Sequence, residues 1–437
     1  LLFNTTKRRI DMNESNTRGR TILGSRFIKM ALLAGMLFPG ISLRAGDEVA
    51  GKEPLILNDE TPALVAPTIE SRLRYEFGEQ DGLEDSHSGT WRNRIGILTR
   101  DISGFQLFAE YEGTLTVDRD SYHAAGVHGP SSKTVIADPE SHELNQLWGS
   151  YTGLDGSLNL KAGRQAINLD GQRFVGTVGW RQNMQTFDAA AVTMKPTDDL
   201  EIYYGYLWKV NRIFGSEVEA GPTTDFIGNS HLVNAKYQGL PLGTLTTYAY
   251  FLDLHNDGGD ANSNNTFGVS LAGDVFSTDL GYYAEYAYQT DAFDSPLSYG
   301  THYAHGSLSA PIIEDVKATV GLEYLGSDNG VGFKTPLATL HKFNGFADRF
   351  LVSTPGNGLA DLYGSIGFKL PFGFGGSVFY HHFWDDDFGT SFGNEVDLVL
   401  TKSLGKGVTL LVKGALFAGE SGQPDVNRAT VELNYKF

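Results

Sequence analysis

The chain has 437 residues, a formal net charge of −18 and no cysteine. The lack of cysteine excludes a disulfide framework, a thiolate metal site and a cysteine nucleophile. The acidic balance argues against a basic groove for nucleic acid as the main feature. With 12% aromatic residues and a mean hydropathy of −0.21, the chain is too aromatic for a disordered polymer and too polar for a bundle of membrane helices.

The first 45 residues differ from the rest of the chain. Basic residues outnumber acidic ones there, and a basic stretch leads into an apolar run over residues 30–43. The run is too short to span a bilayer as a helix, so we predict an export signal with an upstream basic segment over residues 1–45, cleaved near Ala45. An amphipathic surface helix is the alternative, and Met12 is a candidate start. Residues 46–66 are then expected to form a periplasmic N-terminal segment.

From residue 67 onward, apolar and polar side chains alternate in segments of about ten residues. In the last segment Ala429, Val431, Leu433 and Tyr435 alternate with polar neighbours, and the segment ends on Phe437. This is the pattern of a tilted transmembrane strand with one face toward lipid and one toward water. The segments that show it are 68–77, 91–101, 105–116, 144–153, 157–167, 185–195, 199–210, 230–239, 244–254, 265–274, 279–290, 299–309, 316–326, 359–370, 375–385, 393–403, 408–418 and 427–437.

Short turns and long connections alternate between these segments. Turns such as 102–104 and 405–407 follow the even-numbered segments. Longer polar connections follow odd-numbered ones: 78–90, 117–143, 168–184, 211–229, 255–264 and 327–358. A membrane barrel predicts this rhythm, whereas a soluble all-β protein, the alternative, does not. We therefore predict an all-β fold, a transmembrane antiparallel β-barrel of about 18 strands over residues 67–437, with short periplasmic turns and long extracellular loops.

The long 327–358 connection suggests a functional element of its own. Loops of this length in compact proteins are usually functional or disordered. It carries four phenylalanines beside charged residues. We predict that it folds over or into the outer mouth of the barrel and restricts entry.

Clustered cations mark the predicted inner face. Arg72 and Arg74 share one face of the first segment, and Arg92 and Arg94 share one face of the second. Further cations follow at Lys161, Arg164, Arg173 and Arg181. A barrel of this size leaves an aqueous channel, and a ring of guanidinium groups selects anions. The alternative is a ladder of cross-strand ion pairs with the many inward glutamates, which stiffens the wall.

Signals for catalysis or metal binding are weak. His381 and His382 are adjacent, so on a strand they point to opposite faces and make a poor metal pair. The acidic run 385–387 has the oxygen ligands that Ca²⁺ prefers, but a solvated turn explains it as well. No nucleophile elbow, phosphate loop or zinc-helix motif is present in the sequence. We therefore expect no enzyme, no cofactor and no metal.

Four stretches resemble a known family. Residues 163–189 read GRQAINLDGQRFVGTVGWRQNMQTFDA, followed by FKTPLATLHKFNGFADRF at 333–350, YHHFWDDD at 380–387 and NEVDL at 394–398. They are similar to the alginate-export family of outer-membrane porins, and the first is the most specific. The resemblance implies a monomeric barrel of 18 strands in the cell outer membrane, an electropositive arginine-lined lumen, and loops that narrow the entrance. The pore residues it implies are Arg164, Gln165, Arg173, Arg181, Gln182, Asn183 and Asp188.

The combined interpretation is a passive outer-membrane channel for an alginate-like or related anionic saccharide. A general diffusion porin without a defined substrate is the first alternative; an outer-membrane enzyme and an adhesive barrel are the others. The expected partners are outer-membrane lipid, lipopolysaccharide and the anionic saccharide. The barrel-assembly machinery joins them, because a last strand that ends on an aromatic such as Phe437 resembles its recognition signal.

Overall fold

The computed structural model describes residues 64–216, 224–256, 258–275, 278–351 and 354–437. The chain divides into two units, Leu1–Arg44 and Ala45–Phe437, and every described residue belongs to the second. The predicted export signal, residues 1–45, and nearly all of the predicted periplasmic segment, residues 46–66, lie outside the described residues.

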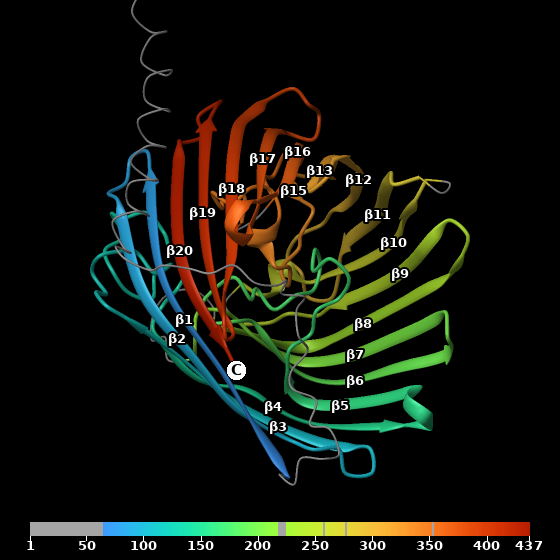
Figure 1. Cartoon of the computed structure of the whole chain (residues 1–437). Helices are drawn as coiled ribbons and strands as arrows, with labels where there is room; N and C mark the ends of the chain where they lie inside the picture. The colour runs from blue at the N-terminus through green and yellow to red at the C-terminus, as the bar shows by residue number, and fades with distance from the viewer. Residues whose placement is uncertain (1–63, 217–223, 257, 276–277, 352–353) are drawn as a thin grey trace, which may run out of the picture. The chain divides into compact units, whose positions relative to one another are not determined.

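An antiparallel sheet of 18 strands closes on itself (Figure 1). Each strand pairs with the wall strands before and after it, and β1 pairs with β20, so the sheet has no free edge. The wall strands are β1 (Val65–Gln80), β2 (Ser86–Thr99), β3 (Phe105–Thr116), β4 (Ser141–Gly153), β5 (Leu158–Gln165), β6 (Thr186–Thr197), β7 (Leu200–Asn211), β8 (Asp225–Leu240), β9 (Gly243–Leu252), β10 (Asn264–Asp274), β11 (Gly281–Asp291), β12 (Gly300–Ile313), β13 (Val316–Leu325), β16 (Leu359–Leu370), β17 (Phe374–Trp384), β18 (Ser391–Gly405), β19 (Val408–Gly419) and β20 (Val426–Lys436).

Every segment predicted from alternation corresponds to one of these strands, so the predicted barrel is confirmed. One predicted long connection, 78–90, is wrong, because β1 continues to Gln80 and β2 begins at Ser86. Ser86, Ser88 and Thr90 look like loop residues in the sequence, but they are buried on the inner face, where small polar side chains suit a wall around a polar lumen. A hairpin, β14 (Ser327–Asp328) and β15 (Val331–Gly332), begins the long connection before β16.

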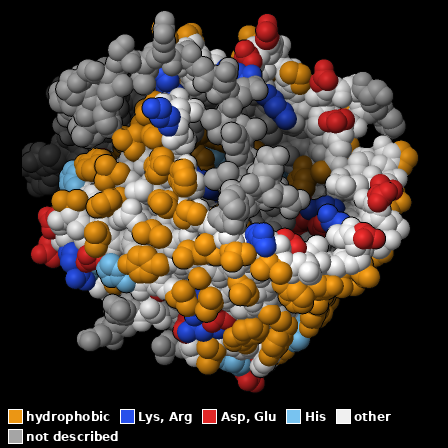
Figure 2. Space-filling model, turned by 60° about the horizontal axis from the view of Figure 1, so that its bottom comes forward, with side chains coloured by type: hydrophobic (Ala, Val, Ile, Leu, Met, Phe, Trp, Pro, Cys, Tyr) orange, Lys and Arg blue, Asp and Glu red, His pale blue; other side chains and the backbone are white. Residues whose placement is uncertain are grey.

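Large apolar side chains cover the outside of the wall. Leu73, Ile95 and Leu107 are 54%, 54% and 63% exposed, and Figure 2 shows hydrophobic side chains spread over the outer surface. An apolar surface of this extent is unfavourable in water. Transfer into hydrocarbon stabilises it by about 1.5–3 kcal/mol for each large side chain that leaves the water. No helix in the described part of the chain is both long and apolar enough to cross a membrane.

The inside of the barrel has a packed core of its own. Tyr250 and Tyr303 project inward from the wall and pack with Phe174, and Tyr303 also packs with Phe333; both phenylalanines belong to connections between strands. A barrel of 18 strands is wide enough for water to fill it. Here the connections have brought apolar side chains into that space, so the lumen is narrowed by protein.

Candidate functional site

Two connections meet inside the barrel. They are residues 166–185 between β5 and β6, here the first inner loop, and residues 333–358 between β15 and β16, here the second inner loop. Val175 and Leu337 form a parallel bridge, and the Gly176 N–H donates to the Leu337 carbonyl at 2.9 Å. Both residues of the bridge are almost fully buried. The two loops therefore form one internal structure and support each other.

Carboxylates of β18 hold the second inner loop by its backbone. The Ala347 N–H donates to Glu395 at 2.6 Å, and the Phe346 N–H donates to Asp397 at 3.3 Å. Gly345 has a φ of 82°, and a Cβ there would lie 2.4 Å from the Glu395 carboxylate. Glycine is needed because it combines this left-handed conformation with a close approach. The 327–358 connection was predicted to fold either over or into the outer mouth of the barrel, and it folds into the lumen.

A buried cluster around His341 fixes residues 341–348 of the second inner loop, here called its tip. The ring lies 2.5 Å from Asp348 through Nδ1 and 2.8 Å from the Lys413 ammonium through Nε2. It stacks on Trp180 of the first inner loop at 4.4 Å between ring centroids. Lys413 donates to Nε2 and Asp348 accepts from Nδ1–H, so the ring is neutral. Burial lowers the pKa of His341 to about 3, and the opposing attraction of Asp348 does not restore it.

We expect acid to release this tip. Once released, His341 has its ordinary pKa of 6.5 and takes up a proton that the packed ring refuses. The stability that the cluster gives is therefore complete above pH 6.5 and falls as the pH drops toward 3. Between pH 7.5 and pH 5 the loss is about 2 kcal/mol. Trp180 fluorescence, isolated by subtracting the spectrum of W180F, should change over this range.

The non-titrating variant H341Q is the control for that titration. Its Trp180 signal should change much less than that of the wild type between pH 7.5 and pH 5. The titratable groups that remain in the cluster are Asp348, whose pKa burial raises and Arg181 lowers, and Lys413, which lies over the Trp180 ring at 3.7 Å. An equal titration in H341Q would show that another group controls the tip.

The predicted wall arginines are buried anchors. Arg74 donates to Asp138 at 3.0 Å, to Glu432 at 2.7 Å and to the Trp180 carbonyl at 2.5 Å. Arg72 donates to three successive carbonyls of the first inner loop, those of residues 179–181. Their inward direction follows the alternation, but their hydrogen bonds hold the first inner loop against β1 and β20.

The two predicted arginines of β2 also form ion pairs, and their partners are glutamates of the neighbouring wall strands. Arg92 pairs with Glu70, and Arg94 pairs with Glu112. Arg92 is fully buried, and the side chain of Arg94 is 11% exposed. These ion pairs connect β1, β2 and β3 across the wall, which is the ladder that stood as the alternative to an anion-selecting ring.

The first inner loop carries half of the other predicted pore residues, namely Arg173, Arg181, Gln182 and Asn183. Arg173 donates to Glu323 at 2.7 Å and to Asn344 at 3.1 Å; burial lowers its pKa, but Glu323 outweighs this and raises it. Arg181 donates to Asp348 at 2.6 Å. The remaining ones sit in the same interior. Gln165 donates to the Ala189 carbonyl, Gln182 donates to Thr90, Asn183 is buried, and the Lys161 ammonium lies over the Trp148 ring at 4.1 Å.

Arg164 and Asp188 lie on the other side of the wall. They form an ion pair of 2.7 Å and are opposite each other in the register of β5 and β6. Arg164 is also opposite Leu147, which is 52% exposed on the outer surface, while the next pair, Gln165 and Phe187, is buried inside. Directly opposed residues share a face, so this pair points away from the lumen, unlike the placement expected from the motif.

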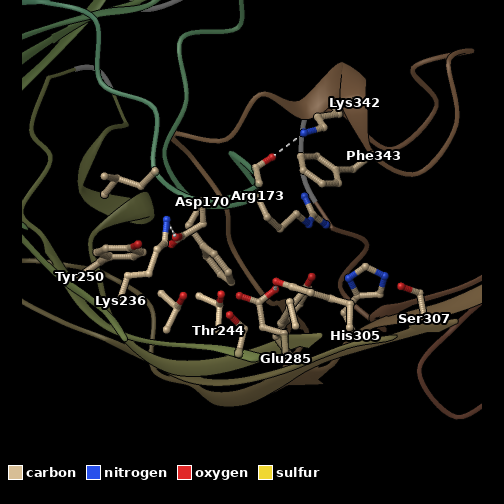
Figure 3. Close-up of a pocket in the computed structure, with 18 residues that line it drawn as sticks. Asp170, Arg173, Lys236, Thr244, Tyr250, Glu285, His305, Ser307, Lys342 and Phe343 are labelled. Carbon is tan, nitrogen blue, oxygen red and sulfur yellow. Dashed lines mark hydrogen bonds and ion pairs between the residues drawn. The ribbon is translucent and has the colours of Figure 1, made fainter. Parts of the chain in front are cut away.

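A cavity of about 380 Å³ remains beside the loops. In Figure 3, Arg173, Lys342 and Phe343 of the loops lie across the hollow from the wall residues Glu285 and His305. The Lys342 ammonium donates to the Gly171 carbonyl at 2.9 Å, and the Lys236 ammonium lies 3.5 Å from Asp170. The wall adds hydroxyl groups and rings: Thr244, Thr246, Tyr250, Ser270, Tyr283, Tyr303 and Ser307.

Most residues of this cavity were not predicted from the sequence. Only Arg173 was among the expected pore residues. A signal existed for Tyr283, because it shares the face of Glu285 in an alternating segment and so points inward. No signal existed for Lys342, because its position depends on how the second inner loop folds back.

The described residues hold no group of three or more His, Asp or Glu side chains placed to bind a metal ion. Asp385 accepts the N–H groups of Gly389 and Thr390, and Asp386 accepts those of Ser327, both N–H and O–H. These carboxylates therefore shape the turn and the base of the second inner loop.

Comparison with known proteins identifies the family. The model of the alginate export family matches residues 66–295, more than half of the chain. The chain belongs to the alginate-export family. The match includes the 163–189 motif and ends before the other three stretches that resemble the alginate-export family. None of the curated proteins matches the chain.

Solved structures of outer-membrane proteins share the fold of this alginate-export family member. OpdK of Pseudomonas aeruginosa has a TM-score of 0.64 at 14% identity, over 85% of this chain and 98% of its own. OccAB4 of Acinetobacter baumannii has a TM-score of 0.66 at 11% identity, over 87% and 100%. OccK2 (OpdF) of P. aeruginosa has a TM-score of 0.62 at 15% identity, over 87% and 99%. The protein is thus an outer-membrane barrel, with its short turns in the periplasm and its long connections outside.

Proposed function

We propose that the chain is a passive channel for anionic saccharides of the alginate type. The observation that carries the proposal is the cavity beside the inner loops. Its three cations, Arg173, Lys236 and Lys342, are set among hydroxyl groups and aromatic rings. Cations suit the carboxylates of a uronate, hydroxyl groups suit its ring hydroxyls, and aromatic faces suit the apolar side of a pyranose ring.

Two comparisons support an anionic solute. The family is named for alginate export. One structure of OpdK was determined with vanillate, a small carboxylate. The alternative, a general diffusion porin, explains the barrel equally well but gives no reason for a cavity whose loop side carries Arg173 and Lys342 and whose wall side carries Lys236. Family and structural relatives are channel proteins, which argues against an enzyme.

The test is current block in a planar bilayer. Uronate oligomers should block the chloride current more strongly than neutral oligosaccharides of equal length, because only the uronates pair with the three cations. The half-blocking concentrations of the two series give the comparison directly. If uronate and neutral oligomers block equally and the channel prefers cations, the proposal is wrong and the protein is a general diffusion porin.

A further inference from the structure

A repeated pair of side chains marks the outer face of the barrel. In four hairpins a tyrosine on the first strand lies next to a histidine on the second, each within 2.7–2.8 Å from Oη to Nδ1. The pairs are Tyr75–His87 on β1 and β2, Tyr111–His142 on β3 and β4, Tyr204–His231 on β7 and β8, and Tyr286–His302 on β11 and β12. We call these four pairs the histidine belt.

The register is the same in all four hairpins. In each, the histidine lies diagonally beyond the tyrosine, two residues nearer the connection that joins the two strands. A fifth hairpin has a variant, in which Tyr380 donates to Asn394 at 2.6 Å and His382 also contacts that amide. A geometry repeated around a closed wall is set by a common environment, not by one local contact.

The hydrogen bond determines what each belt histidine presents. A phenolic O–H is a stronger acid than the N–H of a neutral imidazole, so we assign the tyrosine as donor and Nδ1 as acceptor. The ring proton is then on Nε2, and this N–H is directed away from the tyrosine. His87, His142 and His302 are exposed, and His231 is half-exposed. The belt therefore offers a row of N–H donors to whatever surrounds the barrel at this level.

The belt lies on the extracellular half of the wall, because even His231, the seventh residue of β8, is nearer the extracellular end of its strand than the periplasmic end. His87, His142 and His302 are each among the first three residues of a strand that follows an extracellular connection. All 11 histidines of the chain are among the described residues. None of them is on the outer face near the periplasmic turns, although Tyr151, Tyr237, Tyr282 and Tyr435 are there. Tyrosine at both rims is an ordinary aromatic girdle; histidine at one rim requires an asymmetric environment.

We propose that the histidine belt binds the phosphate groups of the glycolipid that forms the outer leaflet. Phosphate is an acceptor-only group at the depth of the headgroups, and it complements an N–H donor held in a fixed direction. The asymmetry of the belt matches the asymmetry of the membrane. Such contacts hold phosphorylated lipid beside the protein without a lysine or arginine.

The test compares lipids that differ only in phosphate. Folded protein is titrated with bis-phosphorylated lipid A, with the same lipid after phosphatase treatment, and with inorganic phosphate, while native mass spectrometry counts bound lipid. We expect the phosphorylated lipid to bind about tenfold more tightly than the dephosphorylated one, as for one hydrogen bond to a charged group. Inorganic phosphate should not compete at equal concentration, because it is not held at the wall.

Variants separate the belt from the girdle. H87F/H142F/H231F/H302F keeps the aromatic rings and should lose the preference for phosphorylated lipid. The matched control at the periplasmic rim, Y151F/Y237F/Y282F/Y435F, should keep it. Retention of the preference in the histidine variant, or its absence in the wild type, would overturn the proposal.

A second measurement does not depend on a variant that folds. In wild-type protein labelled with ¹⁵N-histidine, the Nε2 resonances of the belt should shift when phosphorylated lipid A is added, and the Nδ1 resonances should shift less. Unchanged Nε2 resonances would also overturn the proposal.

Discussion

Replacing residues 331–355 by a direct link should raise the single-channel conductance several-fold. The segment contains the part of the second inner loop that contacts the first inner loop through Leu337 and β18 through Ala347. Without it, the space that Phe333 and Leu337 fill becomes available to water and ions. The link is short, because the Gly330 carbonyl oxygen lies only 2.6 Å from the position of a Cβ on Gly356. The measurement is conductance in a planar bilayer, on protein that still shows heat-modifiable migration.

A milder change distinguishes a fixed restriction from a hinged one. E395Q/D397N keeps the loop but replaces the two neighbouring carboxyl groups that accept the Phe346 and Ala347 N–H groups with neutral amides. We expect intermittent openings to the level of the shortened variant, because the variant removes the negative charge that this carboxyl pair carries, and an ionised acceptor holds an N–H group more strongly than a neutral one. Wild-type conductance in a correctly folded shortened variant would show that the ions bypass this loop.

Neutralising Lys236 and Lys342 together should weaken uronate block at least about tenfold, since one hydrogen bond to a charged group is worth about 1.5 kcal/mol. Both ammonium groups line the cavity, and neither is deeply buried. K236Q/K342Q should therefore fold normally and leave block by neutral oligosaccharides unchanged. The readout is the ratio of half-blocking concentrations for uronate and neutral oligomers of equal length.

Arg74 is the contrasting position. It is 2% exposed and joins Asp138, Glu432 and the Trp180 carbonyl. R74M removes the nearest cation from two buried carboxylates and leaves them only Arg72, at 3.3 Å from Glu432, and Arg181, at 3.9 Å from Asp138; the loss of one partner of a buried ion pair costs about 3–5 kcal/mol. The expected result is a lower unfolding temperature and a disturbed first inner loop. Uronates could still block K236Q/K342Q as strongly as the wild type, while R74M folds normally but is no longer blocked by them. That result would place the binding site at the wall arginines.

The wall was predictable because its physics is local in sequence. Lipid outside and a polar lumen inside impose a period of two on every strand, so Leu73 and Arg74 already show their opposite directions in the sequence. Even β4, β12 and β17, in which apolar residues occur on both faces, kept enough of that pattern. Residues 86–90 were not recognised as part of a strand, because small polar residues are common both in turns and in lumen-facing strands.

The interior was less predictable because it depends on connections. Alternation gives the direction of Arg74, but its partners Asp138 and Trp180 come from two different connections. Lys342 and Phe343 reach the cavity only because Gly345 and its neighbours are held against β18. For Arg164 the parity rule was available: it is three residues from the inward Lys161, so the two have opposite directions in a regular strand.

The seam between β1 and β20 has a consequence for assembly. Arg74 and Glu432 are separated by 358 positions, and the chain between them includes all the other wall strands. Until β20 arrives, both open edges carry backbone groups that hydrocarbon cannot satisfy. Closure and insertion are therefore coupled. Arg74 also donates to the Trp180 carbonyl of the first inner loop. Pairing of β20 with β1 therefore closes the wall and completes the contacts of this loop in one step. The lumen reaches its final, narrowed form only when the barrel is closed.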